Sequence, residues 1–292
     1  MVTRALVGMA GIAGAAALGV LATAGAGADI VANEPTPEAA RSVAAPATAG
    51  LPAPAPVQEA NIPYDGRFTF VRIRTDVSGG RGMPRSFLPG GRRGWGQPPW
   101  AHDYPRAERN LARILTATTL LNTYEGGSNI LTFDDPELHS YPLAYVSEPG
   151  FWEMDEAEKE GLRSYLLKGG FVIFDDFGGP RDWANFEAQM MRVLPEGRFY
   201  DLSDLDPLPT VFDSFFEISD PEALAPPYRG GWPQYHGIFE DNDPAKRLML
   251  VANFNNDLGD YWEFSDSGWL PIDLTNEAYK FGVNYIIYAM TH

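Results

Sequence analysis

Two adjacent aspartates, Asp175 and Asp176, follow the uninterrupted apolar run Phe171 to Phe174. Such a run is typical of a strand buried on both faces of a parallel sheet. Ligands of open α/β sheets bind beyond the carboxyl ends of the strands, so this pair is a candidate catalytic site. Paired carboxylates can act as general acid and base, hydrogen-bond sugar hydroxyls, or hold a hard cation. The alternative is that each aspartate only caps a turn or the next helix.

The same pattern of an apolar run followed by polar side chains recurs twice. Acids follow Ile130 to Phe133, and amides and an acid follow Leu248 to Phe254. Parallel strands end at one edge of a sheet, so we expect some of these groups to meet there. The candidate ligand-binding residues at and beside these strand ends are His102, Asp103, Asp134, Asp135, Glu148, Asn256 and Asp257.

Metal binding stays open, and no cofactor is predicted. The strand-end carboxylates suit magnesium or calcium, and His102, His139 and His236 would extend the choice to transition metals. None of these histidines shows ligand spacing along the chain. Metal ligands are therefore unassigned, and a divalent metal is an alternative rather than a prediction.

Familiar catalytic motifs are absent from the sequence. It contains no Gly-x-Gly-x-x-Gly after the first expected strand, no Walker-type phosphate loop, no His-Glu-x-x-His and no Gly-x-Ser-x-Gly. It also contains no cysteine, which excludes a thiol nucleophile and a disulfide framework. The formal net charge of −17 disfavours nucleic acid and anionic membrane surfaces as partners.

The N-terminal part predicts export. Residues 1–28 combine Arg4, an apolar stretch and a small-residue cleavage pattern, as in a signal peptide. An uncleaved membrane anchor at residues 5–28 is the alternative. Residues 29–63 are rich in Ala and Pro and lack aromatic residues, which is typical of a linker without a folded core. We therefore expect a periplasmic or secreted protein, membrane-bound only through an uncleaved N-terminus.

Residues 64–292 alternate between strand and helix patterns, which predicts one doubly wound α/β domain with a mostly parallel sheet. Expected strands cover 68–74, 129–133, 143–146, 171–174 and 248–254, with 261–264 as an antiparallel edge. Expected helices start at Asp103, after Asp155 and near Asp182, and a last one covers 276–290. Asp155 and Glu158 have the spacing of a capping box at the start of the second of these helices. Residues 199–246 predict an irregular aromatic flap.

Two further sets of side chains have open roles. The loop 77–101 contains Arg81, Arg85, Arg92 and Arg93, which either clamp an anionic ligand or are solvated. Four tryptophans either form sugar-stacking platforms or belong to the core. These are Trp95, Trp100, Trp152 and Trp232.

Several segments resemble an uncharacterised bacterial family. They are Trp-Ala-His-Asp-Tyr-Pro-Arg-Ala-Glu-Arg-Asn-Leu at 100–111, Leu-Arg-Ser-Tyr-Leu-Leu-Lys-Gly-Gly-Phe-Val-Ile-Phe-Asp-Asp at 162–176, Asn-Asn-Asp-Leu-Gly at 255–259 and Gly-Val-Asn-Tyr at 282–285. The family is a domain of unknown function often encoded near MoxR-type ATPases and von Willebrand A-domain proteins. The resemblance covers roughly residues 66–292.

The resemblance implies a flavodoxin-like fold, similar to class I glutamine amidotransferases and trehalose-utilisation proteins. In the amidotransferases a nucleophilic cysteine follows the corresponding strand, where this chain has Asp175 and Asp176. The resemblance therefore argues against amidotransferase chemistry and implies von Willebrand A-type envelope proteins as partners.

Two functions follow as hypotheses. The first is an envelope domain that binds a small molecule or sugar, or assembles with partners. The alternative is a hydrolase or carbohydrate-active enzyme that uses Asp175 and Asp176, with or without a metal. Whether the protein is an enzyme is left open by the sequence.

Overall fold

The computed structural model describes residues 60–77, 98–227 and 231–292. Predictions for the signal peptide or anchor, for linker residues 29–59, for the four loop arginines and for Trp95 lie outside these residues. At the end of the predicted linker, Ile62 N donates to Asn129 Oδ1 over 2.9 Å, and Asn61 pairs with the backbone of Ile130. Within the described ranges, no helix combines the length and the apolarity needed to cross a bilayer.

Among the described residues, seven strands form one sheet in the order β3-β1-β4-β6-β9-β8-β7. Strands β3, β1, β4, β6 and β9 are parallel, whereas β8 runs antiparallel to both β9 and β7. The bounds are β1 Phe68–Ile73, β3 Thr123–Leu131, β4 Leu143–Ser147, β6 Phe171–Phe177, β7 Tyr200–Asp201, β8 Gln234–Phe239 and β9 Leu248–Phe254. A separate ribbon pairs β2 (Asp76–Val77) with β5 (Trp152–Glu153). The predicted α/β class with a mostly parallel sheet is confirmed.

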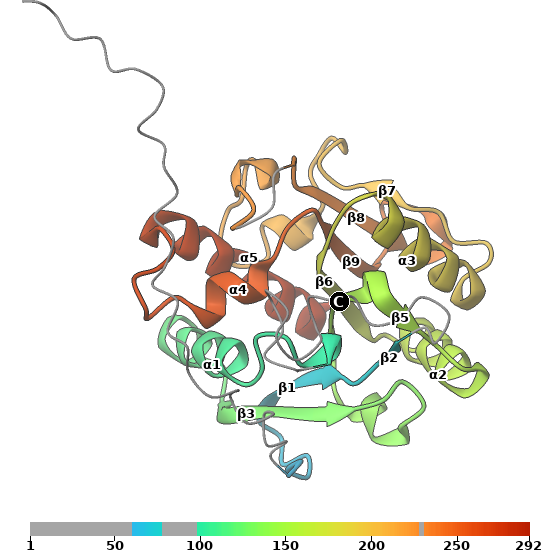
Figure 1. Ribbon diagram of the computed structural model, residues 1–292, viewed down its shortest axis with the longest axis horizontal. Helices are drawn as coiled ribbons and strands as arrows, with labels where there is room; N and C mark the ends of the chain where they lie inside the picture. The colour runs from blue at the N-terminus through green and yellow to red at the C-terminus, as the bar shows by residue number, and fades with distance from the viewer. Residues whose placement is uncertain (1–59, 78–97, 228–230) are drawn as a thin grey trace, which may run out of the picture. The chain divides into compact units, whose positions relative to one another are not determined.

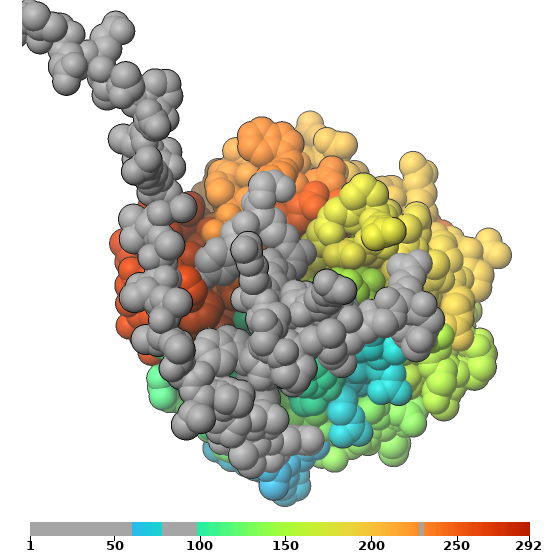
Figure 2. All heavy atoms as spheres, in the orientation of Figure 1, coloured from blue at the N-terminus to red at the C-terminus, as the bar shows by residue number. Residues whose placement is uncertain are grey.

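Helices cover both faces of the sheet, as Figure 1 shows. One face carries α1 (Arg106–Thr118), α4 (Leu258–Glu263) and α5 (Ile272–Thr291). The other carries α2 (Glu156–Leu167) and α3 (Pro180–Val193). In the space-filling view of Figure 2, residues near the start of the described domain (blue) lie against residues from later in the sequence (green). This agrees with the pairing of β1 with β3 and β4.

The central strand β6 separates two apolar cores. All seven of its residues are buried. Phe171 and Ile173 pack into the core under α1 and α5, whereas Val172 and Phe174 pack into the core under α2 and α3. Helix α2 begins with the predicted capping box, in which Asp155 and Glu158 satisfy each other's backbone N–H. The carboxyl ends of β1, β4, β6 and β9 form one edge of this sheet, called here the carboxyl rim.

Some predicted boundaries were wrong. Strand β6 does not stop at Asp175 but continues to Phe177, because hydrogen-bond donors on neighbouring elements make burial of the aspartate possible. Helix α1 begins after Pro105 rather than including it. The predicted edge strand 261–264 belongs mostly to helix α4, and the predicted irregular flap contains β7 and β8.

The core under α2 and α3 supports a direct stability test. The Phe174 ring lies 4.9 Å from Phe186 and 5.2 Å from Trp152, between ring centroids. We expect Phe174→Ala to lower the free energy of unfolding by about 3–5 kcal/mol, because it leaves a cavity among rings that cannot close over it. Urea unfolding measures this change. The control Leu120→Ala, at a fully exposed position, should change it by less than about 0.5 kcal/mol.

Candidate functional site

His102 and Asp176 form the centre of a polar cluster at the carboxyl rim. His102 Nδ1 lies 2.7 Å from Asp176 Oδ2 and 3.2 Å from Asp103 Oδ1. The imidazole is 23% exposed, while both aspartate side chains are fully buried. His102 follows the short helix η2 (Pro99–Ala101), and Asp176 lies near the end of β6. Residues separated by more than seventy positions are thus brought into contact.

Asp103 is a buried carboxylate of the cluster that hydrogen bonds do not compensate. Neither of its carboxylate oxygens has a hydrogen-bond partner among the described residues, and both are inaccessible to solvent. A buried carboxylate normally accepts several hydrogen bonds, because burial without them is costly. Its Oδ1 faces His102, and its Oδ2 faces Gly259 at the start of α4. Such a carboxylate is expected where a bound ion or ligand, which is not part of the chain, interacts with its oxygens.

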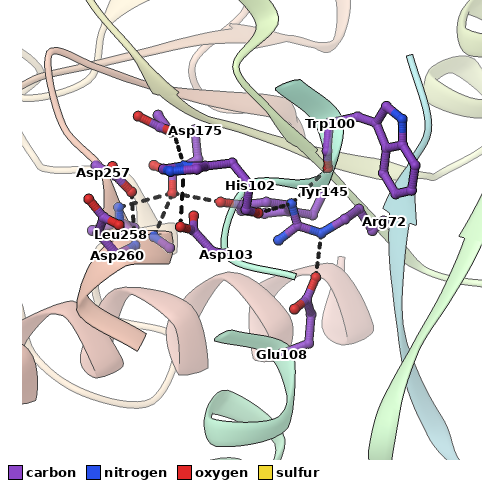
Figure 3. Close-up of polar contacts among 12 residues, drawn as sticks. Arg72, Trp100, His102, Asp103, Glu108, Tyr145, Asp175, Asp257, Leu258 and Asp260 are labelled. Atoms are coloured by element: carbon purple, nitrogen blue, oxygen red, sulfur yellow. Dashed lines mark hydrogen bonds and ion pairs between the residues drawn. The ribbon is translucent and has the colours of Figure 1, made fainter. Parts of the chain in front are cut away.

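Helix α4 adds acids to the same cluster. Asp257 caps the helix by accepting from Asp260 N over 2.9 Å, and Asp260 and Glu263 follow at intervals of three residues. Figure 3 shows Asp257 and Asp260 beside His102 and Asp103 at the beginning of this helix. Asp257 and Asp260 are buried, whereas Glu263 is half-buried.

Ligand atoms of these residues lie close enough to share cations. Asp103, Asp176 and Asp257 each place one carboxylate oxygen within 4.8 Å of the others, and all three residues are buried. Three further triplets overlap with this one within the same distance. They are His102 with Glu148 and Asp176, His102 with Asp257 and Asp260, and Asp103 with Asp260 and Glu263. We call these seven residues the acidic centre.

Asp175 has a different role from its neighbour Asp176. Its Oδ2 accepts from Tyr145 Oη at 2.9 Å and from the backbone N–H groups of Leu258 and Gly259 at 2.9 and 3.0 Å. Its Oδ1 accepts from Asn253 Nδ2 at 3.0 Å. The carboxylate is thus used to attach α4 to β4, β6 and β9. This is the turn- or helix-capping alternative, so the structure does not place Asp175 in a catalytic position.

Arg72 positions the segment that carries His102 and Asp103. It forms an ion pair with Glu108 of α1, and both side chains are 1% exposed. Its Nη1 donates to the carbonyl oxygens of Trp100 and His102, over 2.9 and 2.7 Å (Figure 3). The guanidinium also lies over the Tyr145 ring, 4.8 Å from its centroid. These contacts fix the backbone of residues 100–102 on the sheet.

The acidic centre has two unusual backbone features: residues with positive φ and a glycine where α4 lies against the cluster. Asp103, Glu148 and Asp176 all have positive φ, between 53° and 66°, a conformation that is uncommon outside glycine and concentrates at functional sites. Gly259 allows α4 to lie against the cluster, since a Cβ there would come within 2.3 Å of Asp103 Oδ2 and 2.9 Å of Tyr145 Oη.

Burial and mutual repulsion make these acids hold protons. Burial raises the pKa of Asp103 and Asp257 well above the ordinary range, and nearby carboxylates, Asp176 among them, add to the effect. Burial and Asp257 raise the pKa of Asp260 to about 10. Burial opposes the charge of His102, but Asp103 and Asp176 outweigh it and raise its pKa. Without other cations, the centre is therefore partly neutralised by protons.

The remaining candidates do not belong to the ligand triplets of this centre. Asp134 is exposed, and Asp135 caps a short helix by accepting from Glu137 N. Asn256 is buried and donates to Leu224 O and Tyr235 Oη, so its role is structural. His236 packs against Trp183, and His139 is exposed.

Three tryptophans of the predicted sugar-stacking set are described. Trp152 is 1% exposed in the core, which rules out a stacking platform there. Trp100 is half-buried, and its indole points away from the acidic centre in Figure 3, whereas Trp232 is 78% exposed.

Sequence reasoning missed Asp260 and Glu263, along with Arg72, Glu108 and Tyr145. The first two carried a usable signal: Asp257, Asp260 and Glu263 recur at the spacing of one helix face. For Arg72 the sequence offers no such signal, because a buried arginine within a strand is recognisable only with its partners.

The fold and this centre define a doubly wound α/β protein with buried acids at its carboxyl rim. The chain belongs to the family described as a domain of unknown function (DUF4159), whose family model matches residues 92–290. No curated protein matches the chain. The predicted membership of an uncharacterised domain family is thus confirmed, whereas the neighbouring genes and the amidotransferase likeness stay predictions.

The structural role of Asp175 leads to the first prediction from this site. Asp175→Asn replaces an acceptor oxygen with an N–H₂ group that faces donors. We expect the free energy of unfolding to fall by about 1–3 kcal/mol, the cost of leaving buried groups unpaired. Chemical denaturation measures it. The same change at exposed Asp134 should alter the free energy of unfolding by less than about 0.5 kcal/mol. Equal effects of the two substitutions would show that Asp175 does not anchor α4.

A second prediction concerns pH. The pKa of Asp260, which faces Asp257, Asp176 and His102, is raised from 3.8 to about 10, so the folded chain binds a proton that the unfolded chain releases between these values. The raised pKa of His102 likewise means that, above pH 6.5, the folded chain holds a proton that the unfolded chain releases. Stability should therefore fall as pH rises. We expect chelator-treated protein to melt at higher temperature at pH 6 than at pH 9.

The control for this measurement separates the centre from overall charge repulsion. Asp260→Asn should flatten the pH dependence, whereas Asp213→Asn, at an exposed position, should leave it unchanged. Identical profiles for the two variants would show that Asp260 does not bind the proton.

Proposed function

We propose that this domain binds a divalent cation at the acidic centre and uses it to hold a small ligand. The single observation that carries the proposal is Asp103, a fully buried carboxylate whose two oxygens lack hydrogen-bond partners among the described residues. One of its oxygens lies within 4.8 Å of oxygens from Asp176 and Asp257. A cation between the three would replace the missing hydrogen bonds and relieve the repulsion among like charges.

The donor set narrows the choice of cation. Carboxylate oxygens suit magnesium, calcium and manganese, and the imidazole of His102 adds affinity for transition metals. Manganese fits both ligand types. Because the acids must lose their protons to bind a metal, binding should release protons and strengthen with rising pH.

Charge also bears on the ligand. The carboxylates of the acidic centre outnumber the charges of one dication, and the whole chain carries a net charge of −17. The carboxylates would repel an anionic ligand from such a site. A hydroxyl group, by contrast, can ligate the cation and donate a hydrogen bond to a carboxylate oxygen that does not bind the cation. We therefore propose a neutral, hydroxyl-bearing ligand such as a sugar.

One observation favours hydrolysis as a second function. The 2.7 Å contact between His102 and Asp176 resembles the pairs in which a carboxylate orients a histidine that moves protons. If a bound cation offset the charges of Asp103 and Asp176, which raise the pKa of His102, the neutral imidazole could accept a proton from a cation-bound water. Asp176, rather than Asp175, is then the acid that orients the base.

Broader features remain part of the proposal. The five parallel strands, numbered among themselves, follow the order 2-1-3-4-5, which is that of flavodoxin-like sheets and places ligands where the order reverses. This supports the amidotransferase-like fold, with the acidic centre near the corresponding rim. Export to the envelope and partnership with von Willebrand A-type proteins are proposed from the sequence alone.

Asp103→Asn tests the proposal. It removes a buried acid that lacks hydrogen-bond partners, so we expect the chelator-treated variant to melt at the same or a higher temperature than the wild type. We also expect it to lose stabilisation by manganese, which should reach about 2.7 kcal/mol in the wild type at one hundred times Kd. Thermal melts across manganese, magnesium, calcium and zinc, with and without sugars, measure both effects.

The matched control is Asp134→Asn, which makes the same chemical change at an exposed position. It should retain the full response to the cation. The proposal fails if no cation stabilises the wild type, or if Asp103→Asn responds as the wild type does.

A further inference from the structure

We propose that the acidic centre holds a pair of divalent cations, bridged by Asp103, rather than a single ion. This inference rests on the proposed function, since it specifies the occupancy of the same site. It starts from the number of ligands, the way they divide in space, and the directions of the two Asp103 oxygens.

The ligands divide into two triplets that share no residue. One contains His102, Glu148 and Asp176, which come from the segment before α1 and from the ends of β4 and β6. The other contains Asp103, Asp260 and Glu263, two of which lie on α4. Within each triplet, the ligand atoms lie within 4.8 Å of one another. Each triplet can therefore surround an ion of its own.

Two mixed triplets connect these sets. Asp257 joins Asp103 and Asp176 in one, and His102 and Asp260 in the other, again within 4.8 Å. The two ion positions are thus neighbours. In two-metal enzymes the ions are about 3.5–4 Å apart, a separation that carboxylates span by binding one ion with each oxygen.

Asp103 has the geometry of such a bridge. Its Oδ1 lies 3.2 Å from His102 Nδ1, on the side of the first triplet. Its Oδ2 faces Gly259, on the side of α4 and the second triplet. Both oxygens are buried and lack hydrogen-bond partners among the described residues. A single ion on one side of this carboxylate, bound through one oxygen, would leave the other oxygen uncompensated, whereas two ions on opposite sides use both.

The charge of the acidic centre also favours two ions over one. The acidic centre contains six carboxylates and one imidazole. One dication offsets two negative charges, and a pair offsets four. The nearby guanidinium of Arg72 is already paired with Glu108, so it does not replace the second ion. Buried charges need such compensation, because their repulsion is only weakly screened away from water.

Stoichiometry tests the inference on the full chain. The protein is stripped with a chelator and dialysed against manganese, and bound metal is measured by mass spectrometry and by electron paramagnetic resonance. We expect two ions per chain in the wild type, with the spectrum of a coupled pair. Glu263→Gln removes a half-buried ligand of the second triplet and should halve the bound manganese and abolish the coupling.

Two further variants complete the design. Asp266→Asn changes an exposed acid paired with Arg106, close to Glu263 in sequence, and should keep both ions. Glu148→Gln removes a ligand of the first triplet and should also leave one ion, which provides a second test if Glu263→Gln does not fold by circular dichroism.

The outcomes separate the two proposals. Two ions in the wild type and one in Glu263→Gln support the pair. One ion in both overturns the pair but leaves cation binding intact. No bound manganese in the wild type overturns the pair and the proposed function together.

Discussion

The attachment of α4 to the sheet through Asp175 is the interaction on which the acidic centre depends. One carboxylate accepts from a tyrosine on β4, an asparagine on β9 and the first N–H groups of α4. Because these donors come from three elements, the aspartate fixes their relative positions at a single point. Asp257, Asp260 and Glu263 are brought to the carboxyl rim only because the helix that carries them begins there.

The ion pair of Arg72 and Glu108 has the same function on the other side of the centre. It neutralises two buried charges and uses the remaining guanidinium N–H groups to hold the backbone that precedes Asp103. The oxygens of Asp175 and the guanidinium of Arg72 have hydrogen-bond partners, whereas Glu108 Oε2 has none among the described residues. Asp103 differs from these anchors because neither of its oxygens has such a partner, and so it is the residue we expect to need a ligand.

The fold was largely predictable because burial and periodicity are local signals. The run Phe171 to Phe174 identified the central strand, and the capping box at Asp155 identified the start of α2. The site was predictable only in part. Asp175 and Asp176 are identical in type and adjacent, yet one is a helix anchor and the other faces His102. Their difference is set by donors on β4, β9 and α4 that the sequence does not place.

The errors have the same origin. Residues 261–264 contain Tyr, Trp and Phe, which favour a strand when considered alone, but docking against α1 and α5 makes most of them helical. Asp134 and Asp135 repeat the strand-end pattern of β6. They lie beyond β3, however, at the edge of the sheet, and neither belongs to a ligand triplet of the acidic centre.

Gly259 has a consequence for comparing members of this family. Its missing side chain leaves the space in which Asp103 and Tyr145 meet the start of α4. Any homologue with a larger residue there must displace the helix or the acid, and so cannot keep this constellation unchanged. That one position therefore sorts homologous chains into those able to share the chemistry of this centre and those that retain only its scaffold.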